Sequence, residues 1–204
     1  MARKSKNIPY KKIIAIYCEG DSEKAYFEML RRKYNSPNVH TEKIEKVSVN
    51  SLGLSGLSLL KKAKTKVDRL SKKKRVEKVY VVFDRDDFTE PDLQKCDVFA
   101  RKNDITIIFS SINLEVWILM HYRPVHKQYT PNELNAILSS EDYFNTDYAK
   151  FKGNQYDEYL FDRIKTAKEN ADALQKRYQK PWYKNNLYTN INEEITNIFG
   201  VTEF

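Results

Sequence analysis

The stretch VVFDRDDF, residues 81–88, ends a run of apolar residues with three carboxylates in four positions. The continuously apolar segment 78–84 is typical of a strand buried on both faces of a sheet. Carboxylates as close as those of Asp84 and Asp86 are stable when protonated, separated by water or bridged by a cation. Oxygen ligands suit Mg²⁺ or Mn²⁺. Asp87 could join such a site or cap the next segment, and a plain acidic turn is the alternative for the whole motif.

Apolar periodicity around this stretch predicts alternating strands and helices. This order predicts an α/β fold with a mainly parallel sheet of about four strands flanked by helices. The expected strands are 11–18, 40–49, 78–84 and 105–110, and the expected helices are 22–34, 55–75, 91–103 and 113–122. Asp21 or Ser22 is the expected N-cap of the first helix, and 51–56 is an expected loop.

The character of the chain changes after about residue 125. The remaining residues are polar and rich in Tyr and Asn, and PWYKNN at 181–186 is a break. We expect a catalytic domain over 1–125 and a helical region over 126–204 packed on it. The expected helices of this second region are 132–139, 156–178 and 187–199.

A second acidic group follows the first expected strand. Glu19 follows that strand directly, and Gly20 allows the backbone to turn sharply. The carboxyl ends of parallel strands meet at one edge of the sheet, where ligands bind. We therefore expect Glu19, Asp84 and Asp86 to form a three-carboxylate metal site. Glu19 could be a ligand or a general base.

Three segments together carry a resemblance to a known family. IAIYCEGDSEKAYFEML at 14–30 and VYVVFDRDDF at 79–88 resemble the Toprim domain, and with FSSINLEVWILMHY at 109–122 they resemble the RloB-like family of bacterial defence proteins. NNLYTNINEEI at 185–195 is a weaker match near the end of the chain. Leu114 and Ile112 depart from the family pattern, where an aromatic residue and a proline are common. These two changes could alter the loop shape but leave the carboxylates in place.

The resemblance implies a Toprim-like fold and a Mg²⁺-dependent (or Mn²⁺-dependent) nuclease that acts in phage defence and abortive infection. In the family pattern Glu19, Asp84 and Asp86 would hold the metal. Related Toprim effectors cut transfer RNA, and family members often sit beside an ATPase. Because Toprim domains also perform other phosphoryl chemistry, the fold alone does not assign nuclease activity.

Several neighbouring side chains are candidates for supporting roles. Glu23 could lie behind the metal ligands or stabilise the start of its helix. Glu115 has apolar neighbours, so its charge needs a metal, an arginine or backbone amides as partner. His121 could transfer a proton or bind phosphate, or be a hydrogen-bonded histidine at a helix end. Asn113 and Arg85 are further candidates for supporting roles. Arg85 could bind a carboxylate or a phosphate.

The charge of the chain favours a polyanionic partner. Its 204 residues include 36 Lys and Arg against 28 Asp and Glu, for a net charge of +8. The expected helix 55–75 and the residues just after it carry the candidate phosphate-binding side chains Lys61, Lys62, Lys72, Lys73 and Arg75. An ordinary solvated helix end is the alternative. RNA is favoured over DNA as the substrate.

Other functional classes were weighed beside the ribonuclease. A DNA nuclease of the Toprim class and a non-catalytic subunit that joins an ATPase both stay open, as does self-association. The sequence has no Walker A motif and no GxSxG motif, which argues against a P-loop ATPase and a serine hydrolase. Two cysteines and the lack of a long apolar segment favour a soluble cytoplasmic protein without membrane contact.

Overall fold

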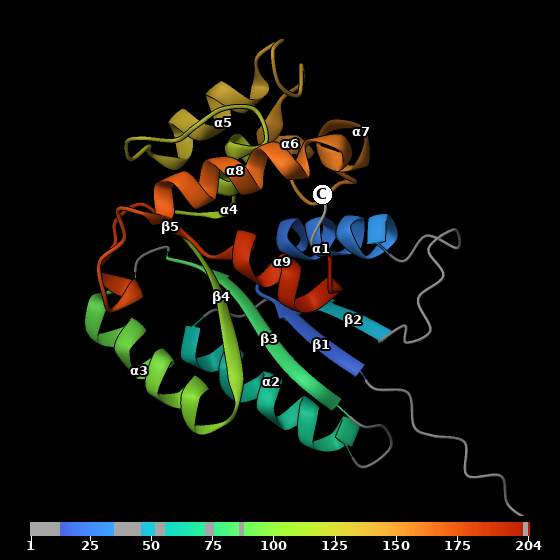
Figure 1. The fold of residues 1–204 in the computed structure, drawn as a ribbon, viewed down its shortest axis with the longest axis vertical. Coiled ribbons are helices and arrows are strands. Elements are labelled where there is room, and N and C mark those ends of the chain that lie inside the picture. Colours follow the sequence, from blue (N-terminus) through green and yellow to red (C-terminus); the bar gives the residue numbers. More distant parts are fainter. Residues whose placement is uncertain (1–12, 35–45, 52–55, 72–75, 86–87, 202–203) are drawn as a thin grey trace, which may run out of the picture.

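A single five-stranded sheet organises the chain in the computed structural model (Figure 1). The structure describes residues 13–34, 46–51, 56–71, 76–85, 88–201 and 204. The strand order is β2-β1-β3-β4-β5, and only the last pair is antiparallel. The strands are β1 (Ile13–Cys18), β2 (Lys46–Ser51), β3 (Val76–Asp84), β4 (Ile105–Ser111) and β5 (Tyr188–Thr189). The prediction of an α/β fold with a mainly parallel sheet is confirmed, and the fifth strand is an addition.

The first four helices alternate with the strands, as predicted. They are α1 (Asp21–Tyr34), α2 (Gly56–Ser71), α3 (Glu90–Lys102) and α4 (Leu114–Met120). Figure 1 shows α1 on one face of the sheet and α2 and α3 on the other. The expected start of the second strand at 40–45, most of the expected loop 51–56, and the expected helix end at 72–75 lie outside the described residues.

The region after residue 125 differs from a simple helical extension. The expected helix 156–178 is three shorter elements, and the expected helix 187–199 begins instead with β5. Tyr188 and Thr189 extend because they pair with the edge of β4, a tertiary contact that local periodicity does not encode. The elements are α5 (Pro131–Ser139), α6 (Tyr148–Phe151), α7 (Asp157–Leu160), η1 (Phe161–Arg163), α8 (Ile164–Gln175), η2 (Trp182–Lys184) and α9 (Ile191–Phe199).

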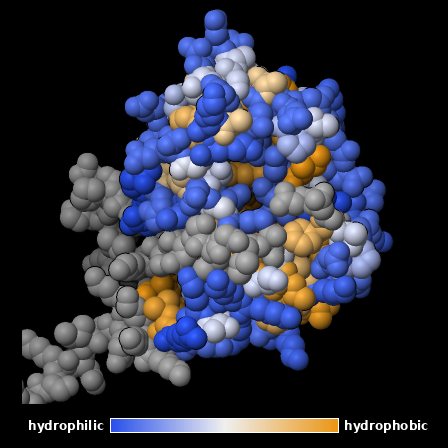
Figure 2. All heavy atoms as spheres, turned by 180° about the vertical axis from the view of Figure 1, so that it is seen from behind, coloured by the Kyte–Doolittle hydropathy of each residue, from blue (hydrophilic) through white to orange (hydrophobic). Residues whose placement is uncertain are grey.

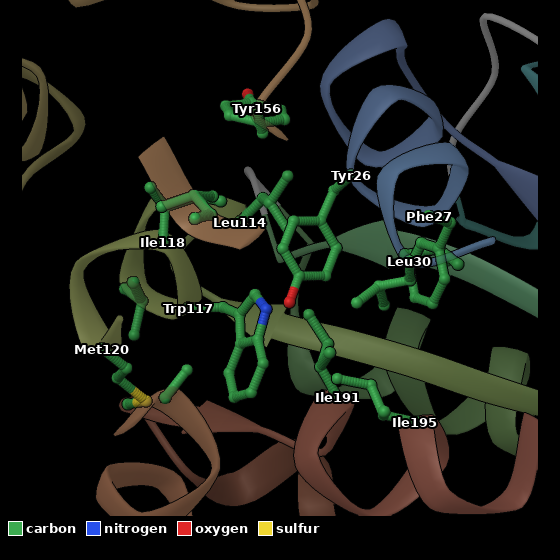
Figure 3. Packing of buried hydrophobic residues seen from close by; sticks show 14 of the residues in the cluster. Tyr26, Phe27, Leu30, Leu114, Trp117, Ile118, Met120, Tyr156, Ile191 and Ile195 are labelled. Carbon is green, nitrogen blue, oxygen red and sulfur yellow. The ribbon is translucent and has the colours of Figure 1, made fainter. Parts of the chain in front are cut away.

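Two apolar cores fill the two sides of the sheet. The larger core joins α1 and α4 to α5, α8 and α9, so the C-terminal elements share it with the first half of the chain. Trp117 is fully buried at its centre, near Tyr26 and Ile191 (Figure 3). The smaller core packs α2 and α3 against the opposite face. Since Trp117 is wholly enclosed, its role is packing in this core.

The surface of the described residues is predominantly polar. Figure 2 shows hydrophilic side chains over most of the rear face, with hydrophobic residues in small separate groups. Val98 is the one large hydrophobic side chain of the described residues that is exposed. Among those residues, no helix combines the length and the apolar character that crossing a bilayer requires.

Candidate active site

The carboxyl ends of β1 and β3 bring two of the predicted acids together. The parallel register places Cys18 beside Val82, and the amide of Glu19 continues the ladder by donating to the carbonyl oxygen of Val82 over 2.9 Å. The carboxylate of Glu19 therefore lies at the end of β3. The backbone amide of Asp84 donates to Glu19 Oε2 over 3.2 Å. Two segments 65 residues apart in the sequence thus meet at one sheet edge.

Asp84 lies in an environment that opposes its negative charge. Its Oδ2 accepts a hydrogen bond of 3.0 Å from the backbone amide of Leu114, at the start of α4. Loss of contact with water, followed by the charges of Glu23, Glu115 and Glu19, raises the pKa of the Asp84 carboxyl well above its usual range. The amide of Leu114 acts in the opposite direction but is outweighed. Four acidic side chains therefore act on one another at this edge.

The N-termini of two helices face the acidic side chains. The first turn of α1 contains Glu23, and the first turn of α4 contains Glu115. Glu23 Oε2 accepts a hydrogen bond of 3.0 Å from the amide of Gly20, just before the helix. The prediction that Asp21 or Ser22 is the N-cap is wrong, because α1 already begins at Asp21. The partial positive charge of a helix N-terminus favours carboxylates placed in this way.

Glu115 is paired with a lysine from the C-terminal region. Its side chain is 4% exposed, and Oε1 lies 2.9 Å from Nζ of Lys152, which is 32% exposed. Lys152 directly follows α6, and Gly153 after it has φ +82°, a conformation that favours glycine. A Cβ atom on Gly153 would lie 3.1 Å from Cβ of Asp21, so this loop packs closely on the start of α1. The partner expected from the sequence was a metal, an arginine or backbone amides, and the lysine was missed.

Two tyrosines enclose the same side of the acidic cluster. The hydroxyl groups of Tyr148 and Tyr156 lie 3.4 Å apart, and both rings are fully buried. Burial raises the pKa of Tyr156 to about 12, and the charges of Glu115 and Glu23 act in the same direction. The sequence contains little that predicts the packing of these tyrosines and of the loop after α6 beside the acidic side chains. Gly153 is the one glycine between Gly56 and Gly200 and marks the turn, but nothing in the sequence connects it to Glu115.

The structure places His121 in the core, which favours the expected alternative of a hydrogen-bonded histidine at a helix end over a catalytic role. Its side chain is fully buried, Nδ1 lies 3.0 Å from the carbonyl oxygen of Trp117, and Nε2 lies 3.1 Å from the hydroxyl of Tyr26. A carbonyl oxygen only accepts, so Nδ1 carries the proton and Nε2 accepts from Tyr26. Burial lowers the pKa of His121 to about 3. The imidazole is therefore a neutral, fully hydrogen-bonded packing residue.

Arg85 points away from the carboxylates and holds the C-terminal loop. Its guanidinium donates to the carbonyl oxygens of Tyr183 and Asn185, and Nη1 lies 3.5 Å from Oδ1 of Asn186. Its own backbone amide donates to the carbonyl oxygens of Ser110 and of residue 112. The predicted contact of Arg85 with a carboxylate is not found among the described residues. Arg85 instead fixes the chain that leaves β3 to the segment before β5.

Asn113 directly precedes the residue whose backbone amide binds Asp84. It immediately precedes Leu114, is 8% exposed, and its side chain does not cap α4. Its Oδ1 is buried without a hydrogen-bond partner in the described part of the chain. A buried amide oxygen of this kind normally has a partner. A cation or an ordered water would supply one.

The remaining predicted residues are exposed or lie outside the described part. Lys61 and Lys62 are exposed on α2, whereas α1 covers the opposite face of the sheet (Figure 1). Within residues 13–34, 46–51, 56–71, 76–85, 88–201 and 204, no three His, Cys, Asp or Glu side chains are grouped closely enough to hold one ion. Outside the described residues lie Asp86, Asp87, Lys72, Lys73 and Arg75.

Comparison with known proteins supports the family suggested by the motifs. The RloB-like protein family matches residues 14–198, which include both carboxyl-end segments and the C-terminal elements as far as α9. Neither the curated proteins nor the solved structures gave a significant match. The match extends over most of the 204 residues, and the chain belongs to the RloB-like protein family.

Proposed function

We propose that this protein is a Toprim-type, Mg²⁺-dependent endonuclease that cuts phosphodiester bonds in RNA. The observation that carries the proposal is the meeting of Glu19 and Asp84, 3.2 Å from carboxylate oxygen to backbone amide, at the carboxyl ends of neighbouring parallel strands. The pKa of Asp84 is raised by burial and then by the charges of Glu23, Glu115 and Glu19. A site that forces acidic groups together is typical of catalytic centres.

The oxygen atoms of Glu19, Asp84 and Asn113 suit a hard divalent cation. Glu19 and Asp84 provide carboxylate oxygens, and the buried Oδ1 of Asn113 has no partner among the described residues. Oxygen donors with room for water are the ligands that Mg²⁺ prefers. Asp86, two residues beyond Asp84, is the proposed third carboxylate. A divalent cation bound there would polarise the scissile phosphate and make a water molecule more acidic.

The protein side chains would have separate tasks in this reaction. Glu19 could hold the cation or accept the proton of the attacking water. Glu115 is held by Lys152 at 2.9 Å, so its orientation is fixed before any ligand arrives. Glu23 stabilises the turn before α1 through the amide of Gly20. His121 has no part in proton transfer in this scheme, because both of its nitrogens are engaged in the core.

The proposal is tested with two nucleic acids and one matched pair of variants. Purified protein is incubated with total tRNA and with plasmid DNA, each with Mg²⁺, Mn²⁺ or EDTA. We expect RNA cleavage that needs the divalent ion and that falls at least about 100-fold in Asp84→Asn. Asp68→Asn is the control, because Asp68 is exposed on α2 and pairs only with Lys64 among the described residues.

Each result has a distinct meaning. Cleavage of plasmid but not tRNA would make the protein a DNA nuclease of the same class. Equal activity in Asp84→Asn and Asp68→Asn would remove the acidic cluster from the reaction. An inert wild-type protein that nevertheless co-purifies with an ATPase would favour the non-catalytic subunit.

We further propose that this activity serves phage defence through abortive infection together with an ATPase partner, as the family resemblance implies. The cellular consequence is a protein that harms its own host once active. Expression of the wild type should therefore be toxic, and Asp84→Ala should abolish the toxicity at an equal protein level. Toxicity that persists in Asp84→Ala would contradict a role for hydrolysis.

A further inference from the structure

A polar groove lies between α1 and the loop that follows α6. Its volume is about 330 Å³. On the helix side it is lined by Lys24, Glu28 and Arg32, which are spaced four residues apart and so follow one face of α1 for about 12 Å. Residues 152–155 line the opposite side. The groove thus runs along α1 from the first turn to the last.

One end of the groove adjoins the candidate active site. Lys152 lines the groove and also binds Glu115, with 2.9 Å between Nζ and Oε1. Asp21 lines the same end and follows Gly20, whose amide donates to Glu23. A chain lying in the groove would therefore lead directly to the acidic cluster.

Among the charged side chains that the structure describes along this face of α1, Lys24 is available to bind a ligand. Glu28 is paired with Arg31 at 2.5 Å, and Arg32 is paired with Asp157 at 2.6 Å. Lys24 forms no ion pair with any side chain that the structure describes, and it lies at the end nearest the acidic cluster. The carboxylate of Asp21 at this end is exposed, so water and salt screen it.

The loop side of the groove presents amide groups. Asn154 Nδ2 donates to the carbonyl oxygen of Phe151 over 2.6 Å, which fixes the side chain and leaves Oδ1 as an acceptor. The side-chain amide of Gln155 is exposed and makes no hydrogen bond within the described residues. Amide groups combine a donor and an acceptor, as the edges of nucleic-acid bases require.

We propose that this groove binds unpaired nucleotides that flank the scissile phosphate, with Lys24 on a phosphate and Asn154 and Gln155 facing bases. The proposal builds on the proposed nuclease function. Clefts of roughly 300–1,000 Å³ hold compact ligands, and this groove lies at the small end of that range. Double-stranded RNA is instead recognised over about 16 base pairs. The ligand class is therefore a single-stranded loop or end.

Binding is measured by fluorescence anisotropy with the full-length wild type in EDTA, so that hydrolysis does not interfere. The probes are a short labelled single-stranded RNA, the DNA of the same sequence and an RNA duplex. We expect a single strand to bind more tightly than the duplex. Lys24→Gln should weaken single-strand binding about fivefold and reduce the salt slope by about 0.7, the value for one lost phosphate contact.

Lys150→Gln is the matched control, because Lys150 is 86% exposed, pairs with Asp147 and does not line the groove. Equal binding of the duplex, or equal affinities of Lys24→Gln and Lys150→Gln, would overturn the proposal. If the expected binding is found but neither tRNA nor plasmid is cleaved in the presence of Mg²⁺, the nuclease proposal is wrong and the proposed binding groove is supported. If Lys24→Gln still cleaves RNA with an unchanged KM, the nuclease proposal is supported and the proposed role of the groove is wrong.

Discussion

The helices on the two sides of the sheet bury different kinds of side chain. On the side of α2 and α3 the core is apolar, and Asp97 is its one buried acid among the described residues. On the side of α1 and α4 the larger core also encloses Glu23, Glu115 and His121. Buried charge costs free energy unless it is paired. The comparison indicates that the first side mainly stabilises the fold, whereas the second also positions the site.

The strongest test of this difference removes the cation that reaches Glu115. Lys152→Met keeps the aliphatic stem but leaves a carboxylate of 4% exposure without its partner. We expect a loss of about 2–3 kcal/mol in the free energy of unfolding, near the lower limit for a broken buried pair because Lys152 is itself partly exposed. Chemical denaturation at neutral pH measures it.

Lys150→Met is the control for Lys152→Met, since its ion pair with Asp147 is on the surface. We expect a change within about 0.5 kcal/mol for this variant. The double variant Lys152→Met with Glu115→Gln should recover part of the lost stability, because no buried charge then remains unpaired. Equal losses in the two lysine variants would mean that the loop after α6 does not stabilise the acidic cluster.

A second test uses acid, which should affect the α1 side through His121. The pKa of His121 in the folded protein is lowered to about 3 by burial, whereas an unfolded histidine titrates near 6.5. The unfolded chain therefore binds more protons below pH 6.5, and stability falls as the pH decreases towards 3. At pH 5 this group costs about 2 kcal/mol relative to neutral pH. Urea unfolding at pH 7 and pH 5 measures the difference.

His121→Gln offers the comparison for the acid test. The amide can still accept the hydrogen bond from Tyr26 and donate to Trp117, but it does not titrate. We expect the fall in stability between pH 7 and pH 5 to be about 2 kcal/mol smaller than in the wild type. An unchanged difference would show that His121 is accessible to protons in the folded state and would reopen its role in the reaction.

The sequence was sufficient for features that depend on local pattern and on the rules of parallel sheets. Continuous apolar runs predicted β1, β3 and β4, and the rule that parallel strands end at one sheet edge predicted that Glu19 lies near Asp84. The apolar periodicity of 22–34 located α1 within one residue. Each of these inferences needs only neighbours in sequence or the fixed geometry of βαβ units.

Features that depend on distant contacts could not be predicted. Lys152 looked like any solvated lysine, because its partner Glu115 lies 37 residues earlier. The two residues of β5 are extended only through β4. His121 matched a family motif, and only the enclosing Tyr26 and Trp117 identify it as a packing residue. Tertiary partners decide these cases, whereas local propensity is neutral towards them.

The smallest expected effect is a gain in stability when charge is removed from the acidic cluster. The pKa of Asp84 is raised in the folded state, so the folded protein binds more protons than the unfolded chain, and stability falls as the pH rises above about 4. Asp84→Asn keeps an acceptor for the amide of Leu114 and removes the charge. We expect its melting temperature in EDTA to rise by about 2–4 °C at pH 7, the effect of roughly 1 kcal/mol in a domain of this size, and by less at pH 4.

The buried acid on the other side of the sheet completes the comparison. Asp97 accepts a hydrogen bond of 3.0 Å from Nε1 of Trp182 and is paired with Arg101, so Asp97→Asn removes a compensated charge and should lower the melting temperature. Mg²⁺ should stabilise the wild type and Asp97→Asn more than Asp84→Asn, because a ligand stabilises the state that binds it. If Asp84→Asn melts lower than the wild type, as Asp97→Asn should, the carboxylates at the sheet edge are not in electrostatic conflict. The argument for a cation between them would then lose its physical basis.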